Sequence, residues 1–171
     1  MAIDFSVNKL LGEFQCSHRL SQYDGACANI HGHSYRVSVS YKESGAFDAW
    51  KNSRSKMLLD FAFFKPLKVR INNMMDHRLL MNKDDELVGV AGSMDITLMD
   101  GDPTAENIAY AILCDLARMF IGLPDAEFEV SVCVEETSTC FAEITAKSAD
   151  FGKIQEEEVW RLKAFNVNLG V

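Results

Sequence analysis

The stretch from His31 to Lys42 alternates between two kinds of residue, and this alternation constrains the fold more than any other feature. One parity holds histidine, tyrosine and valine, and the other holds glycine, serine, arginine and lysine. A period of two over this length predicts a β-strand with one apolar and one solvated face. Phe14, Cys16 and His18 also share a parity, so a preceding strand is expected to bring His18 beside the histidines of the second strand.

Two helices are expected downstream. The first is capped by Asp60 and runs to about Met75. The second begins at Pro103-Thr104, carries an apolar stripe at helical spacing, and ends at Gly122.

The remaining segments predict two more strands, at 127–135 and 140–147. The order ββααββ predicts an α+β fold, in which a four-stranded antiparallel sheet carries both helices on one face. Residues 83–101 are turn-rich and are expected to include a mobile loop. Residues 155–165 form an amphipathic stretch, whose Trp160 needs a partner surface.

Composition is typical of an ordinary globular protein. The chain has 171 residues, 48% of them hydrophobic, and a formal net charge of −8. We expect one domain at 1–150 and a C-terminal tail extension at 151–171. The acidic balance argues against nucleic acid and against an anionic membrane surface as partners. No apolar run approaches the ~18 residues of a membrane-spanning helix, and Asp4 stands where a signal peptide would be basic, so a cytoplasmic location is predicted.

Five cysteines are an odd number in a chain large enough to bury a core without disulfides. Free thiols are therefore expected, which fits a reducing compartment. Four of the five, Cys16, Cys114, Cys133 and Cys140, fall inside predicted regular elements, where a thiol packs as a small apolar side chain.

Three of the four histidines are expected to form a metal site. His31 and His33 are at i and i+2 of a strand, so both rings project from one face about 7 Å apart. Burying them without partners is costly, whereas three neutral imidazoles around a divalent metal satisfy one another's nitrogens. With His18 they offer three nitrogens and leave a fourth position open, as in catalytic zinc sites. Each histidine alone is more often a core or surface residue.

Other residues carry weaker signals. Cys27, in a loop four residues before His31, is either a thiolate favoured by a nearby cation or a buried apolar side chain. Asp76-His77 is either a carboxylate-oriented proton shuttle or a common dipeptide without a role. Glu136 has the inward parity of the third strand, so it either recognises a ligand with paired N–H donors or pairs with a basic side chain at the core edge.

The chain resembles the 6-pyruvoyl-tetrahydropterin synthase family over about residues 3–147. The matching blocks, in order, are Phe14-x-x-x-His18-Arg19-Leu20, Cys27-x-x-x-His31-Gly32-His33, Asp60-Phe61, Met75-Asp76-His77-x-x-Leu80-x-Asn82, Pro103-Thr104-Ala105-Glu106-Asn107 and Glu136-Thr137. The three residues between Cys27 and His31 are similar to the bacterial 6-carboxy-5,6,7,8-tetrahydropterin synthase branch of the family. Cys27 itself disfavours a branch that has glutamate there and makes a folate precursor.

This resemblance implies a tunnelling fold, in which the sheets of three subunits join into a barrel and two trimers stack into a homohexamer with active sites between subunits. It also implies zinc (Zn²⁺) as cofactor, held by His18, His31 and His33. The implied substrate is 7,8-dihydroneopterin triphosphate, and the implied products are 6-carboxy-5,6,7,8-tetrahydropterin, acetaldehyde and triphosphate, on the route to 7-deazaguanine nucleosides such as queuosine.

The resemblance further implies roles for single residues. Cys27 would be the base, Asp76 and His77 the proton relay, and Glu136 the anchor of the pterin ring, with help from Thr104 and Glu106.

The chain departs from the family pattern in three respects, two of length and one of charge: its acidic balance leaves few obvious groups for a triphosphate. The stretch 83–101 and the tail after Asp150 are longer than usual, and either could alter the substrate mouth or the assembly. Arg19, Arg78 and Lys65 are candidates for binding the triphosphate by position alone. Two alternatives stay open: 6-pyruvoyl-tetrahydropterin synthase activity, and a non-catalytic oligomer that binds a pterin or purine.

Overall fold

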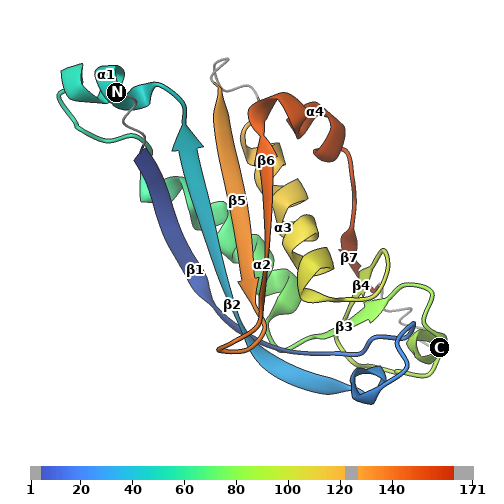
Figure 1. The fold of residues 1–171 in the computed structure, drawn as a ribbon. Helices are drawn as coiled ribbons and strands as arrows, with labels where there is room; N and C mark the ends of the chain where they lie inside the picture. The colour runs from blue at the N-terminus through green and yellow to red at the C-terminus, as the bar shows by residue number, and fades with distance from the viewer. Residues whose placement is uncertain (1–4, 122–126, 164–171) are drawn as a thin grey trace, which may run out of the picture.

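The alternating patterns correctly predicted the central strands. In the computed structural model, which describes residues 5–121 and 127–163, β2 (His31–Glu43) pairs with β1 (Phe5–His18) on one side and with β5 (Phe128–Glu135) on the other. β6 (Phe141–Lys147) lies beyond β5. These pairs are antiparallel, as expected, and form one long, twisted surface (Figure 1).

A β-bulge in β1 decides which of its residues face the core. Leu11 is an extra residue in the register between β1 and β2. One extra residue reverses the alternation of faces, and after the bulge Phe14, Cys16 and His18 are all buried. His18 is thereby placed directly opposite His31.

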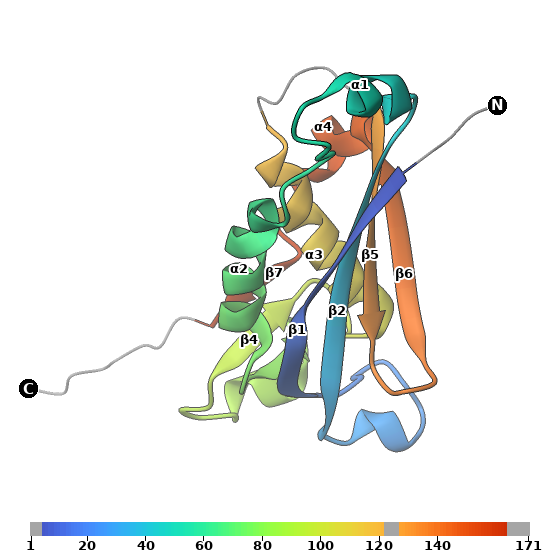
Figure 2. The same cartoon turned by 90° about the vertical axis from the view of Figure 1, so that its left-hand side faces the viewer.

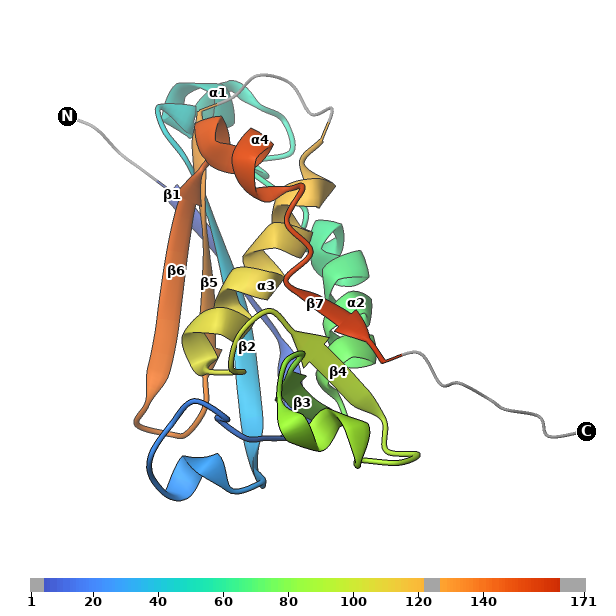
Figure 3. The ribbon, with the colours of Figure 1, turned by 90° about the vertical axis from the view of Figure 1, so that its right-hand side faces the viewer.

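Both predicted helices form and cover the same face of this sheet (Figures 2 and 3). A 3₁₀ turn at Phe61–Phe64, capped by the Asp60 carboxylate, leads into α2 (Lys65–Met75). The Thr104 hydroxyl caps α3 (Ala105–Met119). The inward faces of the two helices and of the four long strands form one apolar core.

The remaining helices are short. α1 (Ala46–Asn52) follows β2, and α4 (Phe151–Ile154) follows β6. The predicted helix end at Gly122 lies outside the described residues. No helix within the described ranges is both long and apolar enough to cross a bilayer.

The prediction of a four-stranded, wholly antiparallel sheet was wrong. The sheet has seven strands in the order β6-β5-β2-β1-β3-β4-β7, because β3 (Leu79–Asn82), β4 (Ile96–Met99) and β7 (Trp160–Leu162) extend it beyond β1. The β1–β3 and β3–β4 pairs are parallel, and β7 is antiparallel to β4. The simple ββααββ order therefore describes only part of the chain.

β4 lies within the segment 83–101 and β7 within the tail after Asp150, whereas β3 lies in the family block that ends at Asn82. Within 83–101 the chain forms a 3₁₀ turn at Glu86–Gly89 and then β4, so this segment is not only a loop. All four residues of β3 are buried, which leaves no alternation of faces for a sequence pattern to detect.

The C-terminal segment supplies the last strand and confirms the expectation that Trp160 packs on a partner surface. Its side chain is 2% exposed, and its indole N–H donates to the Asp115 carboxylate on α3 at 2.9 Å. Phe151 and Val159 join the same core. The last two residues of the predicted amphipathic stretch, 164–165, lie outside the described residues.

Candidate active site

Three imidazoles meet at the end of the β1–β2 pair. His18 and His31 face each other across the two strands, and His33 lies two residues farther along β2. One ring nitrogen from each lies within 4.8 Å of the others, which is a geometry that could hold a metal ion. The structure thus brings together the three histidines that the sequence singled out.

Hydrogen bonds at the far side of two rings fix the position of their protons. Nδ1 of His18 lies 2.8 Å from the carbonyl oxygen of Pro103, and Nδ1 of His31 lies 2.8 Å from that of Asn29. Because a carbonyl only accepts, each Nδ1 carries hydrogen and each neutral ring presents a lone pair at Nε2. These two Nε2 atoms are 3.1 Å apart, and facing lone pairs repel unless a cation or a proton lies between them. The donor set therefore fits a metal ion whose ligands are oriented by backbone carbonyls.

Burial also favours the neutral, metal-binding form of the His18 imidazole. The residue is 1% exposed, and burial lowers the pKa of its imidazole below the ordinary value, although the Pro103 carbonyl acts in the opposite direction. The neutral ring is the form that coordinates a metal.

Glu136, the residue after β5, points at the same cluster. Its Oε1 accepts a hydrogen bond from the Tyr35 hydroxyl at 2.9 Å and lies 3.4 Å and 3.8 Å from Nε2 of His18 and His33. Burial raises the pKa of Tyr35, and the Glu136 carboxylate raises it further, so the phenol remains a donor. The sequence placed Glu136 inward but did not single out Tyr35, although its parity with His31 was the available signal.

Cys27 lies in a 3₁₀ turn (Ala26–Ala28) of the segment that joins the two strands carrying the histidines. It is half-buried, and its carbonyl oxygen accepts the Leu20 N–H at 2.9 Å, which closes the segment on itself. The residue that ends this turn, Asn29, accepts a hydrogen bond from Nδ1 of His31 through its carbonyl oxygen at 2.8 Å, so the turn adjoins the three imidazoles.

The Asp76-His77 pair lies at the other edge of β1. Nδ1 of His77 is 3.0 Å from Oδ2 of Asp76, whose Oδ1 accepts the Gln15 N–H at 3.0 Å. That backbone bond, with help from the imidazole, holds the pKa of Asp76 below its ordinary value. His77 has a left-handed backbone, with φ of 57°, and its N–H donates to the Gln15 carbonyl. The His77 side chain is 82% exposed, so it faces outward from this edge.

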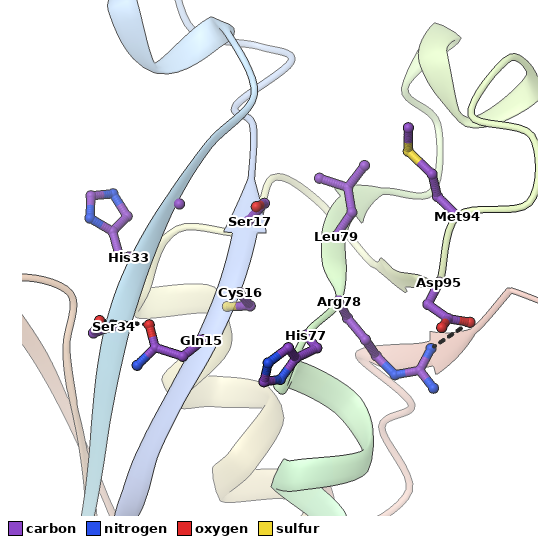
Figure 4. A pocket seen from close by; sticks show the side chains of 11 residues that line it. Gln15, Cys16, Ser17, His33, Ser34, His77, Arg78, Leu79, Met94 and Asp95 are labelled. Carbon is purple, nitrogen blue, oxygen red and sulfur yellow. Dashed lines mark hydrogen bonds and ion pairs between the residues drawn. The ribbon is translucent and has the colours of Figure 1, made fainter.

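A pocket of about 650 Å³ lies along this part of the sheet. Figure 4 shows His33 and His77 on opposite sides of the β1–β2 pair, with Cys16 between them. A second hollow, of about 450 Å³, is lined by His33 and Glu136. His33 therefore lines both the 650 Å³ pocket and the 450 Å³ hollow. Of the Asp76-His77 pair, only His77 lines one of them, the 650 Å³ pocket.

Thr104 and Glu106 occupy the first turn of α3. The Thr104 hydroxyl accepts the Asn107 N–H at 3.2 Å, and Glu106 is an exposed carboxylate at the positive end of the helix dipole. Both residues therefore stabilise the start of the helix. Their contact with substrate stays a prediction.

The three basic residues suggested for the triphosphate have different surroundings. Nε of Arg19 is 3.2 Å from Oδ2 of Asp85, whose side chain is fully buried, so this guanidinium is engaged. Lys65 begins α2, at the end of the helix away from His77. Arg78 lines the larger pocket, where its Nε donates to the Asn73 carbonyl at 2.7 Å. Only Arg78 adjoins that pocket.

Comparison with known proteins agrees with this arrangement. The family model described as 6-pyruvoyl tetrahydropterin synthase matches residues 9–147. A 6-carboxy-5,6,7,8-tetrahydropterin synthase from Rickettsia conorii is 30% identical over 138 residues, which cover 77% of this chain and 94% of the relative. A probable 6-carboxy-5,6,7,8-tetrahydropterin synthase from Halobacterium salinarum is 29% identical over 127 residues, covering 70% of this chain and 73% of the relative.

Solved structures show the same fold. An uncharacterized protein from Wolinella succinogenes superimposes with a TM-score of 0.64 at 20% identity, covering 83% of this chain and 98% of the other. A catalytic-residue mutant of the 6-pyruvoyltetrahydropterin synthase from Plasmodium vivax superimposes with a TM-score of 0.62 at 19% identity, covering 85% and 98%. The sequence blocks, the histidine geometry and these matches lead to one conclusion: the chain belongs to the 6-pyruvoyl tetrahydropterin synthase family.

Proposed function

We propose that this protein converts 7,8-dihydroneopterin triphosphate into 6-carboxy-5,6,7,8-tetrahydropterin, a precursor of 7-deazaguanines such as queuosine. The observation that carries the proposal is the three-histidine cluster, with two Nε2 lone pairs facing each other beside the Cys27 turn. The names of the relatives from Rickettsia and Halobacterium support the same product.

The reaction balances with one water. The first carbon of the three-carbon side chain carries one oxygen and becomes the carboxylate, so the second oxygen comes from water. The other two carbons leave as acetaldehyde, and the terminal oxygen leaves with the triphosphate.

Each residue of the site receives a role in this proposal. Cys27 accepts a proton from the side-chain carbon, and Asp76 and His77 relay protons. Glu136 accepts paired N–H donors of the pterin ring, and Thr104 and Glu106 assist.

His18, His31 and His33 would hold a zinc ion, which supplies Lewis acidity toward a hydroxyl or carbonyl oxygen when bound. The backbone carbonyls that bind Nδ1 of His18 and His31 orient these two rings so that each Nε2 is available to the metal.

Assembly follows from two open strand edges. Among the described strands, β1 pairs only with β2 before Ser17, and β6 pairs only with β5. Such edges invite pairing with another copy, and closing three sheets into a barrel removes them. We therefore propose a homotrimer that stacks into a hexamer, in which the outward-facing His77 serves the site of a neighbouring subunit.

We also propose one synthase domain with a C-terminal extension, in a reducing compartment. Residues 1–150 form the synthase domain, since the family model ends at residue 147, and 151–171 form its extension. All five cysteines are free, which supports a reducing compartment such as the cytoplasm.

The deciding assay supplies zinc-loaded protein with 7,8-dihydroneopterin triphosphate and identifies products by mass. Acetaldehyde with the carboxylated pterin supports the proposal. A pyruvoyl pterin would assign the alternative synthase activity, and unchanged substrate that binds tightly would assign a pterin-binding oligomer.

Replacing Cys27 separates a catalyst from a binder. Cys27→Ala is expected to lower turnover by about 10²-fold or more, because a positioned base is lost. Zinc content and ligand affinity should stay near wild type, since the thiol is neither metal ligand nor ring anchor in this proposal. Cys16→Ala is the matched control, and it should keep turnover. Wild-type turnover in Cys27→Ala would contradict the assignment.

A further inference from the structure

The segment 19–30, called here the Cys27 loop, carries the proposed base between two metal ligands. Its only regular element is the 3₁₀ turn at Ala26–Ala28. No residue from Ser21 to Ile30 is buried, so apolar packing contributes little to its position. Polar contacts must therefore determine where the loop lies.

Two carboxylates make tertiary contacts with this loop near its start: Asp85 lies 3.2 Å from Nε of Arg19, and Asp102 binds the two residues that follow Leu20. Oδ1 of Asp102 accepts the Ser21 hydroxyl at 2.7 Å, and Oδ2 accepts the Gln22 N–H at 2.8 Å. Nδ2 of Asn82, at the end of β3, donates to the same Oδ1 at 3.2 Å. Both oxygens of Asp102 are thus used, and one side chain joins the loop to the extended sheet.

The backbone around Asp102 is itself held firmly. Gly101 has φ of 90°, a conformation that favours glycine. The Asp102 carbonyl accepts the Thr104 N–H at 2.8 Å and Nδ2 of Asn107 at 3.0 Å. The carboxylate therefore projects from a fixed corner at the start of α3.

The next residue in the chain connects this corner to the metal ligands. The carbonyl of Pro103 lies 2.8 Å from Nδ1 of His18. Two adjacent residues thus contact both parts of the site: Pro103 orients an imidazole, and Asp102 holds the loop that bears the thiol. Replacing the Asp102 side chain removes the loop contacts and keeps the Pro103 carbonyl that binds His18.

We propose that Asp102 is a positioning residue, which fixes the Cys27 loop against the start of α3 and so sets the thiol relative to the three histidines. The inference rests on the proposed function, in which Cys27 is the base. Displacing a reacting group by about 1 Å can cost about 10²-fold in rate, so a single anchoring carboxylate can control turnover without contacting substrate.

The test uses full-length, zinc-loaded protein and the variants Asp102→Ala and Asp102→Asn. In Asp102→Ala, amide exchange of residues 20–24 should rise at least about tenfold, while peptides from α3 keep wild-type exchange. Alkylation of Cys27, followed by mass spectrometry at fixed pH, should change in rate. Turnover should fall about 10- to 100-fold with KM and zinc content within about twofold.

Two comparisons sharpen the result. Asp102→Asn keeps one acceptor oxygen and should recover part of both turnover and exchange protection. Asp100→Ala is the matched control, because that neighbouring carboxylate is 66% exposed and pairs only at the surface with Lys83 at 2.8 Å. It should match wild type in every measurement.

Three outcomes would overturn the inference: wild-type exchange of the loop in Asp102→Ala, wild-type turnover, or a loss of zinc parallel to the loss of turnover. Failure of the proposed function looks different. If Cys27→Ala retains turnover, the thiol is not the base, yet the exchange and alkylation measurements still report whether Asp102 fixes the loop.

Discussion

At the scale of single residues, the proton positions of two imidazoles govern what the centre can bind. Backbone carbonyls hold hydrogen on Nδ1 of His18 and His31, which leaves both Nε2 atoms as bases at short range. The repulsion between them is relieved only by a positive charge. The metal preference is thus built into the backbone around the ligands as well as into the ligands themselves.

Metal content should follow these ligands. Wild-type protein is expected to hold about one zinc per chain, and His31→Ala should lose most of it, because two nitrogens do not complete the site. His77→Ala is the control, since that imidazole binds Asp76 at the outer edge of β1. Elemental analysis measures the difference. Full zinc content in a variant lacking all three histidines would refute the site.

The buried thiol next to the site should be unreactive. Burial raises the pKa of Cys16 to about 12, with smaller contributions from Asp76 and Glu136. Because the thiolate is the nucleophile and the raised pKa keeps the thiol protonated at pH 8, alkylation of Cys16 should be slow there and accelerate only toward about pH 12. Cys140 is exposed and serves as the internal reference. Equal labelling of the two in folded protein would contradict this.

At the scale of elements, the C-terminal segment is held by a cluster around one carboxylate. Oδ2 of Asp115 accepts Nε of Arg70 and Nε1 of Trp160, each at 2.9 Å, and Oδ1 accepts Nη1 of Arg118 at 2.5 Å. Arg118 also donates to the Gln155 carbonyl at 2.7 Å. β7 is thus attached to both long helices as well as to β4.

Removing this carboxylate should destabilise the whole domain. Asp115→Ala is expected to lower the free energy of unfolding by about 1–3 kcal/mol, because the buried Trp160 N–H loses its acceptor. The arginine partners are partly exposed and can turn to water, so the cost stays within that range. Denaturant titration gives the value. Asp150→Ala, which removes a surface pair with Lys153, should change it by less than about 0.5 kcal/mol. If both substitutions lowered the free energy of unfolding equally, Asp115 would not be the group that holds the C-terminal segment.

At the scale of the whole molecule, the two sides of the sheet end differently: one ends at β6 and the other at β7. The sheet is extended beyond the end of β1 by β3, β4 and β7, whereas within the described chain the outer edge of β1 before Ser17 and the outer edge of β6 have no partner strand. Phe141 on β6 and Leu10 on β1 are 68% and 51% exposed. Exposed apolar side chains along open strand edges fit the proposed pairing with another copy.

Light scattering should therefore give a mass near three or six chains. Three sheets can close into a barrel only if each subunit uses both open strand edges. Because His77 acts on the site of a neighbouring subunit in this proposal, dissociation should also abolish turnover. A stable monomer at micromolar concentration that retains turnover would refute both the assembly and the shared site.

Much of this protein follows from local sequence. Period-two alternation is long enough in β2 and β5 to identify both strands and the inward side of each. It placed His31 and His33 on one face of β2 and Glu136 on the inward side of the strand that ends before it, and capping residues marked the starts of both long helices. The family blocks identified the same residues independently of any geometry.

Tertiary structure decided the rest. β3, β4 and β7 have three or four residues each, too few for a period to be read, and they form because neighbouring strands satisfy their backbone groups. The contacts of Asp102 and the Pro103 carbonyl join residues about 80 positions apart in sequence. No local pattern encodes such contacts, since they exist only once the start of α3 packs against the end of β1.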